Sequence, residues 1–168
     1  MSKVKYPAVL FLLVVIFSFA LPLFFYKNLP VTVASHFNVV NKADSWMSRE
    51  SFLIVQVIIT AALSIMFLTT AFLIRKLPKS MINLPNKDYW LADERKDETY
   101  SIILRFMYWF GSLTLMFVNA VLLEVYNANI AGKSKINPLI WIYLVVYLIA
   151  TIFLLIKMVT YFMKPEKS

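Results

Sequence analysis

One polar stretch of this sequence places a single histidine close to two carboxylates. His36 is the only histidine, and Asp44 and Glu50 follow it. An imidazole next to carboxylates can serve in acid–base catalysis or as a metal ligand. Zinc sites combine several His, Cys or carboxylate ligands, and this chain has no Cys. We therefore expect His36 to make structural hydrogen bonds. Binding of a partner is the alternative, and metal binding or catalysis is the least favoured role.

Two pairs of carboxylates are spaced by one helical turn, at Asp93/Asp97 and at Glu94/Glu98. Carboxylates spaced in this way could bind a divalent cation. Basic residues lie between them, which favours a solvated helix face with its own charge pairs. The chain has no His-Glu-x-x-His, no glycine-rich phosphate loop and no Ser-His-Asp arrangement with supporting context. We predict that the protein is not an enzyme and that it holds no metal or cofactor.

The composition is typical of a membrane protein. Hydrophobic residues make up 61% of the chain and charged residues 15%, compared with about 45–50% and about 25% in soluble domains. The net charge is +8 at pH 7. The basic residues flank the apolar runs, which indicates contact with anionic lipid and not with nucleic acid. The lipid bilayer is therefore the first predicted partner.

Four apolar runs are long enough to cross a hydrocarbon core, which is about 30 Å thick and needs about 20 helical residues. The runs are residues 7–26, 52–74, 106–126 and 139–163. The first run exceeds the apolar part of a signal peptide and no cleavage site follows it, so we expect it to be retained. The sequence predicts an all-α membrane protein, a single domain (1–168) folded as a four-transmembrane-helix bundle.

Lysine and arginine are divided unequally between the two sides of these runs. One side holds the N-terminus, the loop 75–105 and the C-terminus, with Lys3, Lys5, Arg75, Lys76, Lys79, Lys87, Arg95, Lys96, Lys164 and Lys167. The other side holds the loop 27–51 and the last short loop, with Lys27, Lys42, Arg49, Lys133 and Lys135. Loops rich in Lys and Arg stay in the cytoplasm. We therefore expect both termini to be cytoplasmic, with an outer loop at 27–51 and a cytoplasmic loop at 75–105.

Polar side chains inside a membrane span cost free energy in lipid, so their presence in the apolar runs indicates a structural or functional role. The main ones are Gln56, Ser64, Ser112, Asn119 and Glu124. Spacing by whole helical turns places several of them on shared faces, where they could hydrogen-bond between helices. A small polar cavity for a ligand or an ion is the alternative. Glu124 lies near the outer end of its run, where it could reach the membrane interface or pair with a basic group such as Arg49 or Lys27.

The outer loop has the composition of an ordered cap over the helix ends. A free linker would be richer in Gly and Ser. The apolar side chains that could dock are Leu29, Val31, Val33, Phe37 and Trp46. Asn41 and Asp44 favour turns, and Ser48 could cap the helix that follows it. We expect His36 and Trp46 to hold the loop together, with His36 bonded to loop backbone or to a nearby carboxylate.

At these loops the sequence resembles the DUF1648 family, a domain of unknown function that also opens the SdpI-type bacterial membrane proteins. The family pattern is Leu-Pro, a spacer, His-Phe-Asn, a glycine turn, Asp, Trp and a Ser-Lys pair. The matching residues are Leu29, Pro30, His36, Phe37, Asn38, Asp44, Trp46 and Ser48. Asn41 stands where the family usually has glycine, and asparagine tolerates left-handed backbone. In the cytoplasmic loop, the residues that match a longer branch are Leu84, Pro85, Asn86, Tyr89, Trp90, Glu94 and Arg95.

The resemblance implies a multi-pass protein of the bacterial inner membrane. SdpI-type proteins confer immunity to a secreted toxic peptide, and they carry more spans than the four predicted here. We expect a protein that acts by interaction, whose outer loop meets a peptide, an envelope protein or a membrane protein. One alternative is a small transporter or channel-like protein that uses the intramembrane polar residues. Another is an accessory subunit of a larger membrane complex.

Overall fold

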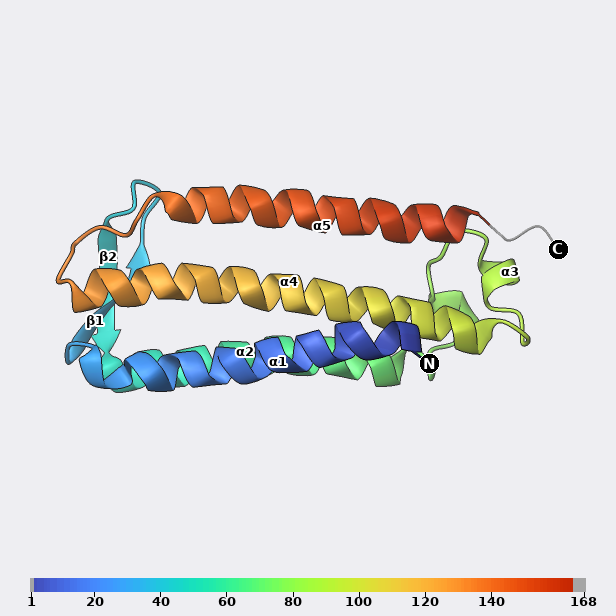
Figure 1. Ribbon diagram of the computed structural model, residues 1–168, viewed down its shortest axis with the longest axis horizontal. Helices are drawn as coiled ribbons and strands as arrows, with labels where there is room; N and C mark the ends of the chain where they lie inside the picture. The colour runs from blue at the N-terminus through green and yellow to red at the C-terminus, as the bar shows by residue number, and fades with distance from the viewer. Residues whose placement is uncertain (1, 165–168) are drawn as a thin grey trace.

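Four long helices run alongside one another in the computed structural model, which describes residues 2–164 (Figure 1). They are α1 (Ser2–Phe25), α2 (Arg49–Leu73), α4 (Lys96–Ile130) and α5 (Leu139–Met163). All four are long and apolar enough to cross a membrane. This confirms the predicted spans and makes the chain a multi-pass membrane protein.

The third span is longer than its apolar run. The sequence predicts residues 106–126, whereas α4 has 35 residues and is therefore about 52 Å long, against about 30 Å of hydrocarbon. Its first turn contains Asp97 and Glu98, and acidic residues stabilise a helix N-terminus through the helix dipole. A hydropathy criterion ends a span at the first charges, while the hydrogen-bonded helix continues through them.

The chain is mostly helical, at 72%, but the expectation of an all-α fold needs one correction. The loop after α1 contains a short 3-10 helix, η1 (Tyr26–Asn28), and an antiparallel hairpin of β1 (Thr32–Phe37) and β2 (Ala43–Ser48). The other long loop contains η2 (Lys79–Met81) and the single-turn α3 (Lys87–Trp90). In β1, Val33 and Ala34 are both buried, and they lie between the exposed Thr32 and residues that are partly or fully exposed.

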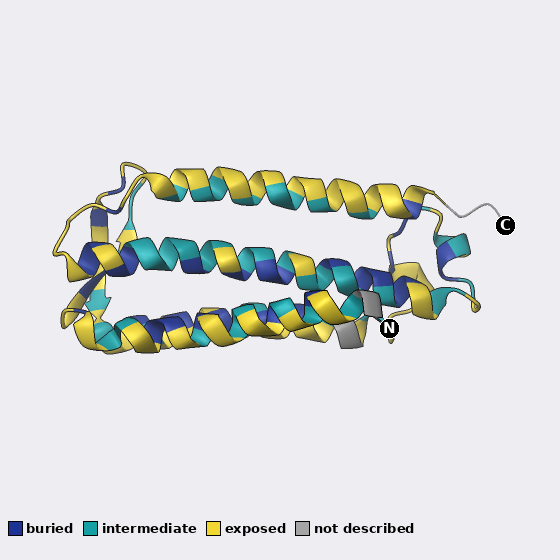
Figure 2. Ribbon diagram, viewed as in Figure 1, coloured by how far each residue is buried: buried dark blue, intermediate teal, exposed yellow. Residues whose placement is uncertain are grey.

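The hairpin lies at one end of the bundle, and the start of α1 and the end of α5 lie at the other end (Figure 1). We call these the hairpin end and the termini end. Helices α1, α2 and α4 pack against one another, whereas α5 packs mainly on α4 and leaves most of its surface exposed (Figure 2). Gly111 allows α4 to lie close to Phe11 of α1 and Phe67 of α2. A Cβ atom at this position would lie 2.6 Å from the ring of Phe11 and 2.9 Å from that of Phe67.

At the termini end, the loop between α2 and α4 closes the end of α5. The indole nitrogen of Trp90 donates to the carbonyl of Phe162 at 2.7 Å. The side-chain amide of Asn86 donates to the carbonyls of Phe162 and Met163 at 3.1 Å each. The last carbonyls of a helix lack partners within it. This part of the loop pattern therefore has a structural role, which the hydroxyl of Thr99 reinforces by donating to the carbonyl of Trp90.

The remaining pattern residues of this loop divide between core and surface. Leu84 joins Trp90 in the apolar cluster at the termini end. The guanidinium of Arg95 lies 4.0 Å from the ring centre of Tyr89. Pro85 is half-buried and Glu94 is exposed. Lys96 pairs with Asp93 at 3.0 Å and holds the pKa of that carboxyl below its usual value, as expected for a solvated charged face.

Candidate functional site

Two asparagines shape the turn of the hairpin. The side-chain oxygen of Asn38 accepts from the backbone nitrogens of Val40 at 3.1 Å and Lys42 at 3.0 Å. Asn41 has a φ of 63°, the left-handed conformation expected at the position where the family usually has glycine. Asn38 is therefore a turn-forming residue, and the turn survives the replacement of glycine by asparagine.

The base of the hairpin is closed by side chains at the junction of α1 and α2. Ser48 caps α2, because its hydroxyl accepts from the backbone nitrogen of Ser51 at 3.1 Å. The guanidinium of Arg49 donates to the carbonyl of Leu29 at 3.3 Å and lies 4.5 Å from the ring centre of Tyr26. Glu50 accepts from the Tyr26 hydroxyl at 3.2 Å. These contacts confirm the predicted cap at Ser48.

Asn129, near the end of α4, binds the backbone of β1. Its side-chain oxygen accepts from the nitrogen of Ala34 at 2.7 Å, and its side-chain nitrogen donates to the Ala34 carbonyl at 3.0 Å. The same nitrogen donates to the carbonyl of Val125 at 2.9 Å. Asn129 and Ala34 are 9% and 5% exposed. The amide thus acts as a further strand partner for β1 and joins the hairpin to the bundle.

The loop between α4 and α5 continues the sheet along the other edge of the hairpin. Lys42 and Lys135 form an antiparallel bridge. The nitrogen of Ala43 donates to the carbonyl of Ser134, and that of Ile136 donates to the carbonyl of Asn41, both at 2.9 Å. From α5, the indole nitrogen of Trp141 donates to the side-chain oxygen of Asn41 at 3.1 Å. Both connections at the hairpin end therefore form one hydrogen-bonded cap.

The apolar anchors of the cap follow the two faces of the strands. Leu29 and Val33 are buried in a cluster with Tyr126, and Phe37 packs against it. The prediction was wrong for Val31 and Trp46, which are 72% and 57% exposed. Val33 pairs with Met47 on the face toward the helices, so the neighbouring pair of Ala34 and Trp46 points the other way. The pair at Ala34 and Trp46 therefore belongs to the outer face.

His36 makes the predicted bond to a carboxylate. Its Nδ1 lies 2.5 Å from Oδ1 of Asp44 across the hairpin, and the histidine side chain is 68% exposed. Glu50 is occupied by Tyr26 and takes no part in the pair. Among residues 2–164, no group of three His, Asp or Glu side chains comes together as a metal site would require. His36 therefore links β1 to β2 at the surface.

A shallow pocket lies where the hairpin meets the end of α4. Its volume is about 310 Å³, and its lining includes Pro30, Thr32 and Trp46 from the hairpin with Lys133 and Ser134 from the following loop. The other outer-loop pattern residues all make contacts within the cap, whereas Pro30 and Trp46 are exposed. Both of these residues line this one pocket, which we call the Trp46 pocket.

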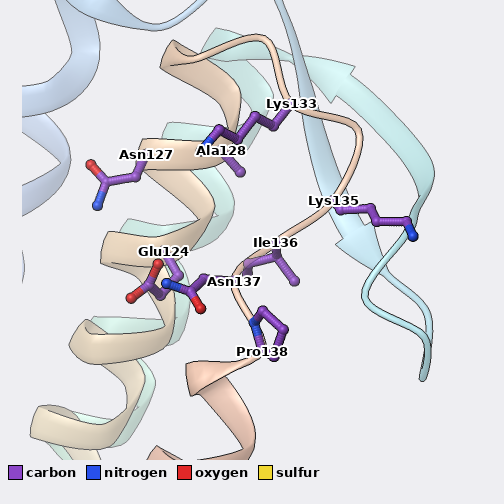
Figure 3. Close-up of a pocket in the computed structure, with 8 residues that line it drawn as sticks. All are labelled: Glu124, Asn127, Ala128, Lys133, Lys135, Ile136, Asn137 and Pro138. Carbon is purple, nitrogen blue, oxygen red and sulfur yellow. The ribbon is translucent and has the colours of Figure 1, made fainter.

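A second pocket, of about 400 Å³, lies between the end of α4 and the start of α5. Its walls include Glu124, Asn127 and Lys133, with Asn137 from the connecting loop (Figure 3). The pairing predicted for Glu124 with Arg49 or Lys27 was wrong. Glu124 faces α5 and accepts from the hydroxyl of Tyr143 at 3.0 Å.

Two of the intramembrane polar residues form hydrogen bonds between helices, and a third bonds within its own helix. Asn119 donates to the hydroxyl of Ser18 at 2.8 Å, and Gln56 accepts from the hydroxyl of Tyr126. Ser112 donates to the carbonyl one turn earlier in α4 at 2.8 Å. Ser64 is 4% exposed and its hydroxyl has no hydrogen-bond partner. These contacts support packing between α1, α2 and α4.

Sequence reasoning missed the residues that join the hairpin to the helices. Asn129 and Trp141 lie outside the family pattern, and they bond residues 95 and 100 positions earlier in the chain. A buried asparagine near the end of an apolar helix was the available signal for Asn129, because such an amide needs partners. Nothing in the local sequence names Ala34 as that partner.

Asn129→Leu keeps the size of the side chain and leaves both backbone groups of Ala34 without partners. Each buried unpaired group costs about 1–3 kcal/mol. We expect limited proteolysis in detergent to cut the variant within residues 31–48, while circular dichroism shows an intact helix bundle. Asn127→Leu, an exposed position on the same helix, is the matched control and should resist cleavage as the wild type does. Equal resistance of Asn129→Leu would refute the anchoring role.

Comparison with protein families identifies one domain. The model of DUF1648, a domain of unknown function, matches residues 13–60. The match runs from the middle of α1 through the hairpin into α2 and contains every residue of the outer-loop pattern. Searches of curated proteins and of solved structures find no match. Residues 13–60 are therefore similar to the DUF1648 domain, and this matched segment forms the hairpin and the helix ends beside it.

Proposed function

We propose that this protein acts by binding a peptide or protein partner at the hairpin end, through the Trp46 pocket. Such a partner would be a secreted peptide in an immunity-like role or a protein of the membrane or envelope. Exposed tryptophan is a frequent anchor of binding sites, because it contributes a large apolar contact at a low cost in side-chain entropy. The pocket would take an apolar or aromatic side chain of the partner.

One observation carries this proposal. Within the outer-loop pattern, Leu29, Asn38 and Ser48 have structural tasks in the cap, and His36 bonds Asp44. Pro30 and Trp46 have no such task and converge on one pocket. Apolar surface is also exposed at the turn of the hairpin. The side chains of Val39 and Val40 at the turn are 80% and 66% exposed. Together with Trp46, these two valines leave apolar side chains exposed on the hairpin, outside the helices.

A rigid platform suits this role. The hairpin is held by Asn129 from α4, by Trp141 from α5 and by backbone bonds to the loop between them. A partner that binds an already ordered surface loses less conformational entropy than one that must order a free loop. Binding at the Trp46 pocket would therefore require no change in the backbone of the hairpin.

We propose that the hairpin end faces outward across the inner membrane of a bacterium. Support comes from the basic residues at the termini end, including Arg75, Lys76 and Lys79 in the loop after α2. Positive charge of this kind is retained in the cytoplasm. In this orientation the Trp46 pocket is accessible to extracytoplasmic peptides.

The orientation can be tested with single cysteines, because the chain has no cysteine of its own. We expect cysteines at Lys42 and Ser134 to react with a membrane-impermeant maleimide on intact spheroplasts. Cysteines at Lys79 and Lys87 should react only after lysis. All four positions are exposed or half-buried, so the lysed sample controls for reactivity. Labelling of Lys79 and Lys87 before lysis would reverse the orientation.

The partner site can be tested by photo-crosslinking in native membranes. A benzophenone amino acid replaces Thr32, which lines the Trp46 pocket, and the adduct is identified by mass spectrometry. We expect a discrete adduct whose yield falls by about tenfold when Trp46→Ala is added, the size of effect that a tryptophan anchor gives. The same probe at Val146, an exposed position of α5, should not give that adduct.

Trp109→Ala is the matched control for Trp46→Ala. Trp109 is 41% exposed and lies in α4 far from the hairpin, so its loss should leave the adduct unchanged. An adduct that survives Trp46→Ala undiminished, or no adduct from Thr32 in a folded protein, would contradict the proposed site.

A further inference from the structure

The second pocket presents both signs of charge at the edge of the bundle. Glu124 supplies a carboxylate, Lys133 an ammonium group, and Asn127 and Asn137 supply amides. In Figure 3 the side chains of Glu124 and Asn137 lie on the same side of α4, and Lys133 reaches across the end of that helix. Lys135 also belongs to the lining, and its side chain extends away from α4. A ligand that satisfies this lining carries a cation and an anion a few bonds apart.

The pocket lies at the depth of a membrane interface. Glu124 is six residues before the end of α4 at Ile130, which corresponds to about 9 Å along the helix. Across from it, Trp141 and Tyr143 occupy the first turns of α5. Tryptophan and tyrosine at a helix end are typical of the headgroup region. A ligand in the pocket therefore sits among lipid headgroups.

An apolar groove uses the turns of α4 that come just before the pocket. It has a volume of about 370 Å³ and lies between α1 and α4, where its walls include Leu13, Phe17, Met116, Ala120 and Leu123. The residues that line the groove come from α1 and α4, and none comes from α5. Asn119 is the polar residue of its lining, and its amide is bonded to Ser18.

The pocket and the groove share one face of α4. Met116, Ala120, Leu123 and Asn127 are spaced by 4, 3 and 4 residues, the spacing of a single helical stripe. The stripe spans about 16 Å, which is half of a hydrocarbon core of about 30 Å. The stripe therefore connects a pocket that holds charges of both signs to an apolar groove, over a depth close to that of one leaflet.

We propose that this stripe binds one phospholipid whose headgroup carries a primary ammonium group. The ammonium group donates to Glu124, the phosphate accepts from Lys133 and the Asn137 amide, and one acyl chain lies along Ala120 and Leu123. An anionic headgroup without an amine could place its phosphate on Lys133, but it would offer no cation to Glu124. A choline headgroup has no N–H to donate to the carboxylate. The site is separate from the Trp46 pocket, although Lys133 borders both.

Native mass spectrometry of the delipidated protein in detergent tests this assignment. The probes are phosphatidylethanolamine, phosphatidylcholine and phosphatidylglycerol at equal concentration. We expect the wild type to retain phosphatidylethanolamine about fivefold more than either competitor, the upper range for a partly exposed charge pair. Glu124→Gln should remove the preference. Glu98→Gln, an exposed carboxylate at the opposite end of α4, should keep it.

The acyl chain is tested by filling the groove. Ala120→Phe should reduce retention of all three lipids, whereas Ala62→Phe on the exposed side of α2 should not. Lys133→Gln gives a second variant should Glu124→Gln fail to fold, and it should weaken all three lipids through the phosphate. Equal retention of the three lipids by the wild type would overturn the proposal. A preference for phosphatidylethanolamine that survives Glu124→Gln would also overturn it, as would unchanged lipid retention in Ala120→Phe. The same holds if free phosphoethanolamine, which has no acyl chain, displaces the bound lipid as well as intact phosphatidylethanolamine does.

Discussion

The hairpin end depends on the side-chain amide of Asn129. It pairs with both backbone groups of Ala34 and so replaces a neighbouring strand that a two-stranded sheet lacks. Isolated hairpins are at best marginally stable in water. Here one edge of the sheet meets Asn129 and the other meets the backbone of Ser134 and Ile136. The hairpin is therefore part of the helix bundle, although it is not helical.

This constraint explains how the family pattern divides. Some pattern residues have a structural role, because they shape or anchor the hairpin. Asn38 forms the turn, and Ser48 caps the start of α2. Strand alternation turns Val33 toward the helices and leaves Trp46 on the outer face. A rigid scaffold that holds an exposed tryptophan in a fixed position fits recognition better than a flexible linker would. The hydrogen-bonded polar pairs between α1, α2 and α4 serve the same rigidity.

Much of this fold could be predicted from the sequence, because hydropathy and local turn chemistry are encoded locally. The four spans, the left-handed Asn41 and the cap at Ser48 follow from such signals. Long-range pairing is not encoded in this way. The sequence did not name Tyr143 as the partner of Glu124, or Ala34 as the partner of Asn129, because each depends on how separate helices pack. The polar start of α4 escaped a hydropathy criterion, and the exposure of Trp46 followed from strand register, which composition does not reveal.

Amide hydrogen exchange of the wild-type protein in lipid nanodiscs tests the rigidity of the hairpin most directly. The measurement compares peptides from residues 32–48 with peptides from the end of α4 and with an isolated peptide of the hairpin sequence. A hairpin anchored as described should exchange on the order of a hundredfold more slowly than the isolated peptide, which corresponds to an opening free energy of roughly 3 kcal/mol. Exchange of residues 32–48 as fast as in the isolated peptide, with α4 still protected, would contradict the account.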